Sequence, residues 1–407
     1  MRRKSQLIAL LIVFPLLAQG QREFKVLHAF GAGTDGAGVW GSVAFDKLGN
    51  VYGTTSGGGN YGYGTVFQLS PQQNGQWKES LLASFKPLDR RGAEPYGGLI
   101  VDPNGRLYGT TQSGGRYGRL GTAFNLSLNG GKWVLSVIHK FGGPGDPTCC
   151  PWSDLLRDSS GNLYGTGDSV FELSPGPTKW KESILHEFAG KNGDGAGPQA
   201  GPIRDADGNL YGTTLYGGGS RVCADGCGTV WQLSPPALAS GTGNWTEHIL
   251  DRFGFSGNEA FPGVGQLALD PQGNLYGAVQ GGKYRAGIIY RLSRVQGGSG
   301  MDETWRETVL YNFTGGADGG FPEGVILDNA GNLYGVCGVG GSYGDGTVFK
   351  LSPQSPSNWE YTLLHTFNGY DGAEPVANLT FGSNGKVYGT TATGGMYGGG
   401  VVFEITS

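Results

Sequence analysis

Histidines and carboxylates recur at fixed places along the 407-residue chain, and these residue types could supply acid–base chemistry. A glycosidase or lyase built on a repeat needs one acid and one base that differ from all the other copies. Most of the acids here occupy equivalent places, and Ala83, Asp251 and Tyr311 replace the histidine in other copies. We interpret the histidine position as a half-buried hydrogen-bonding site and predict no catalytic residue. The residues considered are His28, His139, His186, His365, Glu94, Asp194, Glu259, Asp318 and Glu374.

Metal and phosphate chemistry find little support in the sequence. Residues 205–209 (Asp-Ala-Asp-Gly-Asn) resemble the start of a calcium loop, but the distal Glu is missing and the last copy has Gly382 in place of the Asp. A tight turn, with an Asp that accepts backbone hydrogen bonds and a left-handed Gly, explains the pattern better. The cysteines lack a paired C-x-x-C spacing, and no phosphate-binding loop stands out. We predict no metal site and no cofactor.

Tyrosines offer a second kind of chemistry, which is the binding of polymers. One tyrosine lies in each of several glycine-rich loops, where an aromatic face with a hydroxyl group could contact a glycan. The alternative is that each ring packs over its own loop. These residues are Tyr61, Tyr117, Tyr284, Tyr343 and Tyr397.

The elements that position these residues are seven copies of one unit. The sequence Gly-Asn-Leu-Tyr-Gly or a close variant recurs with a period of 47 to 65 residues, with tyrosines at 52, 108, 164, 211, 276, 334 and 388. Each copy contains four short segments rich in β-branched and aromatic residues, and no long segment has helical periodicity. This pattern predicts an all-β, seven-bladed β-propeller of four-stranded antiparallel blades.

The two ends of the chain complement each other. Residues 23–30 match the end of every repeat, whereas the last repeat stops at residues 401–405. We predict that the N-terminal strand completes the last blade and closes the ring, which leaves no open edge. In such blades the linkers and the second hairpin loops lie on one face. The tryptophans that begin the outer strands are expected to pack between blades.

The N-terminus has the features of a secretory signal peptide. Residues 1–20 contain a basic start, an apolar run shorter than a membrane span, and small residues at Ala18 and Gly20. We expect cleavage after Gly20, a single domain over residues 21–407, and a secreted or periplasmic location without membrane attachment. The acidic formal net charge of −4 argues against nucleic acid as a partner. We expect a monomer.

An oxidising location favours disulfides. Cys223 and Cys227 have the spacing of a small loop bridge. The adjacent Cys149 and Cys150 allow either a vicinal disulfide or two free thiols. Cys337 takes a position that holds Thr in other copies, so we expect a buried lone thiol.

Three phrases of the repeat carry a resemblance to a known family. They are Gly-Asn-Leu-Tyr-Gly-Thr-Thr, Gly-Gly-x-Tyr-Gly-x-Gly-Thr-Val-Phe-x-Leu-Ser-Pro and Trp-x-Glu-x-x-Leu-His-x-Phe. Over residues 23–407 the chain resembles the GloVer tandem repeat of secreted or surface-anchored bacterial proteins. The resemblance implies a location and a repeat architecture but no activity. A more distant likeness to kelch propellers rests on paired glycines and outer-strand aromatics.

Two functions remain open at this point. The first is a secreted binding module on whose loop face a glycan or a protein ligand docks. The second is a polysaccharide lyase or hydrolase. For the first we predict a notch over the third blade, which lacks the glycine–tyrosine loop, rimmed by Trp152, Tyr216 and Arg221. The predicted Cys223–Cys227 bridge would rigidify the loop beside this notch.

Overall fold

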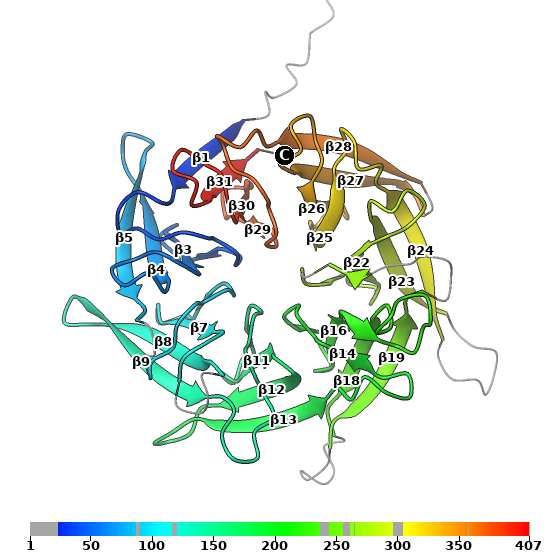
Figure 1. Ribbon diagram of the computed structural model, residues 1–407, viewed down its shortest axis with the longest axis horizontal. Coiled ribbons are helices and arrows are strands. Elements are labelled where there is room, and N and C mark those ends of the chain that lie inside the picture. Colours follow the sequence, from blue (N-terminus) through cyan, green and yellow to red (C-terminus); the bar gives the residue numbers. More distant parts are fainter. Residues whose placement is uncertain are drawn as a thin grey trace, which may run out of the picture.

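Seven antiparallel sheets stand around a central axis in the computed structural model (Figure 1). The structure describes residues 23–86, 90–115, 120–236, 244–254, 261–263, 265–295, 304–356 and 358–406. All regular elements in these ranges are strands. The predicted seven-bladed propeller is therefore confirmed.

The first four blades each run from an inner two-residue strand to a long outer strand. In blade four the linker before the first strand also pairs with the second hairpin, through two short strands. The strands are β2 (Ala44–Phe45), β3 (Val51–Thr55), β4 (Thr65–Pro71) and β5 (Trp77–Ser84); β6 (Ile100–Val101), β7 (Leu107–Thr111), β8 (Thr122–Asn129) and β9 (Lys132–Lys140); β10 (Leu156–Arg157), β11 (Leu163–Thr166), β12 (Ser169–Ser174) and β13 (Lys181–Glu187); and β15 (Ile203–Arg204), β16 (Leu210–Thr214), β18 (Thr229–Ser234) and β19 (Thr246–Arg252), with the added pair β14 (Gly195–Ala196) and β17 (Tyr216–Gly217).

The last three blades follow the same order, and the seventh takes its outer strand from the N-terminus. A short additional strand, β20 (Phe261–Pro262), also pairs with the second strand of blade five. The strands are β21 (Ala268–Leu269), β22 (Leu275–Gln280), β23 (Ile288–Val295) and β24 (Thr304–Asn312); β25 (Gly320–Leu327), β26 (Leu333–Val339), β27 (Thr347–Ser355) and β28 (Asn358–Thr366); and β29 (Thr380–Phe381), β30 (Val387–Thr391), β31 (Val401–Ile405) and β1 (Phe24–Ala29).

Ring closure is made by β1, which pairs antiparallel with β31 from Phe24 opposite Ile405 to Ala29 opposite Val401. In Figure 1 the blue first strand lies beside the red last strand. The Phe24 ring stacks on His365 with centroids 3.6 Å apart, so the first strand also contacts blade six. The predicted closure is confirmed.

The turn between the first two strands of a blade is held by one aspartate. In blade one, Asp46 Oδ1 accepts hydrogen bonds from the backbone N–H groups of Leu48 and Asn50, and Oδ2 accepts from Asn50 Nδ2 and the Tyr52 hydroxyl. Burial favours a higher pKa for Asp46, but these hydrogen bonds together hold the pKa below its usual value. Both carboxylate oxygens of Asp46 accept hydrogen bonds from within the turn, as the turn interpretation predicts. In a calcium loop the carboxylate oxygens would instead contact the ion.

The same tyrosine joins neighbouring blades. Its ring meets the edge of a tryptophan that begins the outer strand of the next blade, with centroids 6.0 to 6.5 Å apart. The glycine that follows the tyrosine is required by packing, because a Cβ on Gly53 would lie 2.4 Å from the Phe67 ring across the strand pair. The expectation that these tryptophans pack between blades is confirmed. The pairs are Tyr52–Trp133, Tyr108–Trp180, Tyr164–Trp245 and Tyr276–Trp359.

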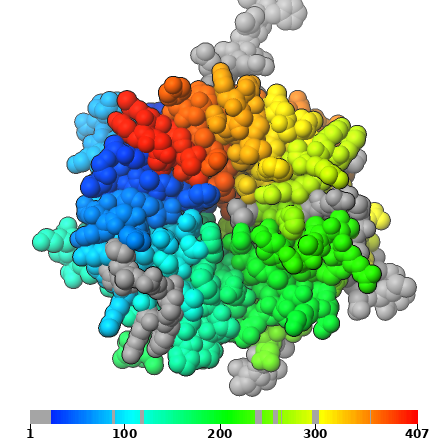
Figure 2. All heavy atoms as spheres, in the orientation of Figure 1, coloured from blue at the N-terminus to red at the C-terminus, as the bar shows by residue number. Residues whose placement is uncertain are grey.

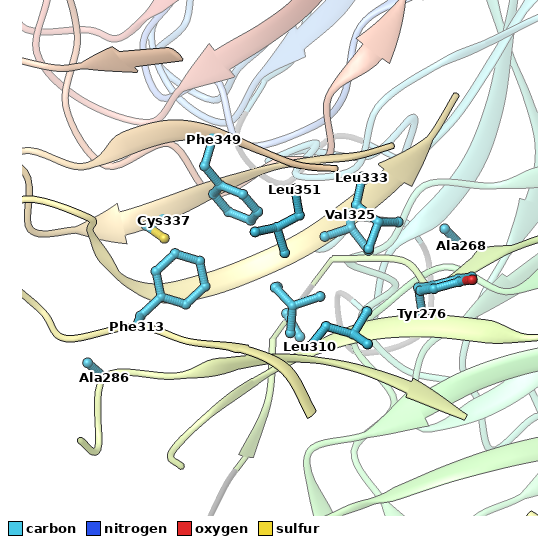
Figure 3. Close-up of a cluster of buried hydrophobic side chains, with 12 residues drawn as sticks. Ala268, Tyr276, Ala286, Leu310, Phe313, Val325, Leu333, Cys337, Phe349 and Leu351 are labelled. Atoms are coloured by element: carbon cyan, nitrogen blue, oxygen red, sulfur yellow. The ribbon is translucent and has the colours of Figure 1, made fainter. Parts of the chain in front are cut away.

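The hydrophobic core consists of clusters between adjacent blades. Figure 3 shows one of them, in which Leu310 and Phe313 at the outer strand of blade five face Phe349 and Leu351 of blade six. Each sheet thus packs face to face on the next, and the wedge-shaped clusters set the spacing of the ring.

The expected signal peptide, residues 1–20, lies outside the residues that the structure describes. Within the described ranges, no helix has the length and apolar character needed to cross a membrane.

Removal of residues 21–30 should destabilise the ring strongly. The deletion exposes the edge of β31 and removes the ring of Phe30, which is fully buried. Loss of one such phenylalanine side chain alone costs about 3–5 kcal/mol. Thermal unfolding measures the effect, and Lys25→Ala on the same strand, which loses only an exposed hydrogen bond to Gly75, is the control. A truncated protein that melts with the full mature chain would refute the closure.

Tyr276→Phe should lower the free energy of unfolding by about 1.5–3 kcal/mol, the cost of a hydrogen bond to a charged acceptor. The hydroxyl donates to Asp270 Oδ2 at 3.0 Å, and the ring stays in place against Trp359. Urea unfolding measures the change. Tyr343→Phe, whose side chain is 67% exposed, should change stability by less than about 0.5 kcal/mol; equal effects in the two variants would contradict the role given to the turn.

Candidate binding site at the centre of the ring

A cavity of about 330 Å³ lies where the linkers of all seven blades converge. Its lining comes mainly from the segment just before each innermost strand, and Gln280 at the end of β22 adds to it. Figure 2 shows a hollow at the centre of this face of the ring. The volume is at the lower end of the range for small-molecule sites.

In blades one, two and four the linker pairs with the second hairpin of its own blade before it reaches the centre. Ala37 bridges to Gly57, Ala93 to Ser113, and β14 to β17. The expectation that linkers and second hairpins share a face is thereby confirmed.

Neighbouring linkers then touch backbone to backbone around the axis. A Cβ on Gly41 would lie 2.3 Å from the backbone nitrogen of Gly98, so only glycine permits this approach. Threonine hydroxyls add hydrogen bonds from one blade to the next, from Thr54 to the Gly97 carbonyl at 2.8 Å and from Thr390 to the Gly41 carbonyl at 3.1 Å. The cavity therefore has rigid walls.

One wall of the cavity is aromatic. Trp40, Tyr96 and Trp152 come from blades one, two and three and form an arc. Their ring centroids lie 5.9 Å apart for Trp40 and Tyr96 and 4.8 Å apart for Tyr96 and Trp152. The two tryptophans remain 38% and 42% exposed, which is unusual for rings of this size. Burial, and then the charge of Glu94, raise the pKa of Tyr96, so its hydroxyl stays a donor.

The opposite wall is polar. It carries the amide side chains of Gln199, Gln266, Gln280 and Asn378, contributed by blades four, five and seven. The Asn378 side-chain oxygen accepts a hydrogen bond from the backbone nitrogen of Gln266 at 3.1 Å, which ties blade seven to blade five and fixes that amide. Neutral donors and acceptors therefore face the aromatic arc.

Two carboxylates also line the cavity. Asp154 follows Trp152 by two residues and accepts a hydrogen bond from the Gly98 backbone nitrogen. Glu323 belongs to blade six and is buried, with 7% of its surface exposed. An aromatic arc, several amides and two carboxylates form a combination suited to neutral ligands with many hydroxyl groups.

Of the three residues of the predicted notch, one lies at the central cavity. Trp152 lines the central cavity, whereas Tyr216 and Arg221 are not among the described residues around it. Tyr216 meets the edge of the Phe261 ring, with centroids 5.9 Å apart. Arg221 is exposed on the enlarged second hairpin of blade four.

The four loop tyrosines that the structure describes lie in blades one, five, six and seven. Tyr61, Tyr284, Tyr343 and Tyr397 have 47–67% of their surface exposed, and lysine ammonium groups lie over the rings of Tyr61 and Tyr284. Tyr117 lies outside the described residues. These four rings do not line the central cavity.

Both cysteine pairs are bonded. Cys223–Cys227 closes the enlarged loop of blade four, and Cys149–Cys150 forms a vicinal disulfide in the linker that ends at Trp152. Cys337 is a free, buried thiol. The vicinal bond thus lies two residues from the aromatic arc.

Sequence reasoning missed most of the cavity residues, although a signal was present. In every blade except the fifth, the cavity is lined by the residue that follows the linker proline, or Val39 in its place in blade one, and this residue differs from blade to blade. Across the repeat this place holds Trp40, Tyr96, Trp152, Gln199, Glu323 and Val376. Variation at one place in an otherwise regular repeat is typical of a functional position.

The fold and this cavity define a seven-bladed repeat propeller with an asymmetric central site. The sequence model of the Gloeobacter/Verrucomicrobia repeat matches residues 12–169 and 254–407, and the chain belongs to this family. The unmatched stretch between them holds β12 to β19, where the loops depart most from the repeat. A search of curated proteins finds no match.

Several solved structures are distantly similar. PorZ, a bacterial surface component of the type-IX secretion system of Porphyromonas gingivalis, is 14% identical, with a TM-score of 0.48 over 90% of this chain and 46% of its own. The PQQ-bound aldose sugar dehydrogenase of Streptomyces coelicolor is 12% identical, with a TM-score of 0.43 over 95% and 98% of the two chains. The α-L-arabinanase of Penicillium chrysogenum, complexed with arabinobiose, is 13% identical, with a TM-score of 0.44 over 76% and 92%. Similarities this distant transfer no ligand or activity to the chain.

Proposed function

We propose that this protein is a secreted or periplasmic carbohydrate-binding module whose central cavity takes one or two sugar units of a neutral glycan. The observation that carries the proposal is the arc of Trp40, Tyr96 and Trp152 facing a wall of amides. Sugar rings present an apolar C–H face and a rim of hydroxyl groups. The arc matches the face and the amides match the rim.

The rigidity of the cavity supports binding without rearrangement. The linkers contact one another through glycines, and the vicinal disulfide lies next to Pro151 and Trp152. A site whose groups are already in place loses little conformational entropy when a ligand docks. The cavity volume limits the contact to the end or a short stretch of a polymer.

The charge of the mature chain is compatible with a neutral partner. Removal of the expected signal peptide takes Arg2, Arg3 and Lys4 from the formal net charge of −4, which gives −4 − 3 = −7. A net negative protein disfavours nucleic acid and other polyanions. We propose that the mature protein acts as a monomer.

A polysaccharide lyase or hydrolase is the second candidate, favoured by the two carboxylates in the cavity. Asp154 and Glu323 come from blades three and six and break the symmetry of the repeat. Acid–base cleavage of a glycosidic bond uses a pair of such groups. Product analysis during the binding experiment separates this activity from binding alone.

Trp40→Ala combined with Trp152→Ala should weaken glycan binding about 100-fold. Each aromatic contact contributes about 0.5–1.5 kcal/mol beyond its buried area; we take the upper end for these two tryptophans, and each 1.4 kcal/mol is tenfold in affinity. A glycan array identifies the ligand, and calorimetry on the strongest hit measures the change. Melting should be nearly unaltered because both rings are partly exposed.

Tyr343→Ala combined with Tyr397→Ala is the matched control, since these rings are exposed but lie outside the cavity. Its affinity should equal that of the unaltered protein. If this control loses binding and the tryptophan variant does not, the ligand binds at the loop tyrosines and not in the cavity. If the unaltered protein forms shortened oligosaccharides and Glu323→Gln does not, the protein is an enzyme rather than a binding module.

A further inference from the structure

Two clusters of histidine and carboxylate side chains lie on the seams to either side of blade three. In each, a histidine of one outer strand meets an aspartate of the following linker and a glutamate of the next outer strand. The side chains are only 9–20% exposed. The clusters are His139, Asp146 and Glu182 between blades two and three, and His186, Asp194 and Glu247 between blades three and four.

The distances in these clusters are longer than those of the histidine–aspartate pairs on two other seams, one of which also carries a partly buried glutamate, Glu79, near Asp35. His28 Nε2 lies 3.1 Å from Asp35 Oδ2, and His365 Nε2 lies 2.9 Å from Asp371 Oδ2. In the two clusters the histidine Nε2 is 3.3 to 3.7 Å from both carboxylates. That separation is at or beyond the outer limit of a hydrogen bond.

In the cluster between blades three and four, three buried polar atoms have no hydrogen-bond partner. His186 Nε2, Asp194 Oδ1 and Glu247 Oε1 are all buried, and none of these three atoms has a hydrogen-bond partner. Three buried polar atoms aimed at one point are costly unless something occupies that point.

The distances fit a tetrahedral ion. Zinc lies about 2.0–2.1 Å from its nitrogen and oxygen ligands, so two ligands at the tetrahedral angle are roughly 3.3–3.4 Å apart. The measured separations of 3.3 Å to Glu182, 3.5 Å to Asp146 and 3.4 Å to Glu247 match this value, and 3.7 Å to Asp194 is slightly longer.

The backbone fixes the aspartates in place. Asp146 accepts hydrogen bonds from the Gly142 and Thr148 nitrogens at 2.7 and 2.8 Å. Asp194 Oδ2 accepts from the Ala189 nitrogen at 2.6 Å, which leaves Oδ1 facing His186. Such supporting hydrogen bonds are what orients the ligands of a metal site.

We propose that each cluster binds one divalent first-row transition ion, for which Zn²⁺ is the probe, through one imidazole and two carboxylates, with solvent in the fourth position. A neutral histidine and two carboxylates balance the charge of the ion. Imidazole and carboxylate oxygen together suit zinc and its neighbours better than calcium, which takes six to eight oxygens.

The position of the ions gives them a structural effect. Each would join two adjacent blades and the linker between them, and both flank blade three. That blade has the shortest second hairpin, with only residues 167–168 between β11 and β12, so it lacks the loop contacts that support other blades. The sequence did not reveal the clusters because the ligands come from two repeats and a linker.

The experiment measures bound zinc in tag-free mature protein after chelator treatment, zinc loading and desalting. We expect two equivalents by elemental analysis, one in His139→Gln, one in His186→Gln and none in the double variant. His365→Gln is the matched control, because Phe24 occupies the place of the second carboxylate on its seam, and it should retain two equivalents.

Glu182→Gln and Glu247→Gln, which keep shape and lose charge, provide a second test if a histidine variant does not fold. Each should lose one equivalent. Absence of zinc from the unaltered protein, unchanged zinc in the variants, equal loss in His365→Gln, or displacement by a tenfold excess of Ca²⁺ would each overturn the proposal. If the variants of only one cluster lose zinc, the proposal would be overturned for the other cluster.

Discussion

One tyrosine per repeat connects the local turn to the assembly of blades. Its hydroxyl donates to the aspartate that closes the first hairpin, and its ring packs against the tryptophan of the following blade. The side chain is nearly inaccessible, and burial followed by the neighbouring carboxylates raises the pKa of Tyr164 to about 12, so it stays a donor. Register within a blade and contact between blades therefore depend on the same residue.

The arrangement tolerates substitution where a partner can replace the aspartate. In blade seven Gly382 stands in its place, and Asn384 Nδ2 donates to the Tyr388 hydroxyl at 2.8 Å. In blade two the Tyr108 hydroxyl is 3.5 Å from Asp102 Oδ2, a weak contact at most. The ring still forms, because each seam adds its own hydrophobic cluster and the strand β1 closes the circle.

Regular positions make the scaffold, and irregular positions make the sites that we propose. Glycines bring the linkers together at the axis, so linker positions that differ from blade to blade lie around a common cavity. At the rim, the equivalent place differs from one seam to another. It holds a histidine–carboxylate cluster on two seams, a histidine–aspartate pair at His365, and the tyrosine pair Tyr311–Tyr361, with ring centroids 4.8 Å apart, between blades five and six. Side-chain substitutions at these places make the repeat protein asymmetric without a change in the backbone.

The sequence by itself determined the architecture. Seven copies of one first hairpin, five of them with the same Asp–Asn–Tyr hydrogen-bond pattern, specify seven blades. A first strand that matches the one missing from the last repeat specifies closure. Both are constraints within one repeat or between two strands, so the order of residues is enough to encode them. Only the tertiary structure decided which residues meet. Trp40, Tyr96 and Trp152 follow one another at intervals of 56 residues, yet they line one cavity. The sequence instead grouped Trp152 with Tyr216 and Arg221, which are not among the lining residues. The rim clusters likewise depend on the angle between adjacent blades, which side-chain packing sets and no local motif encodes.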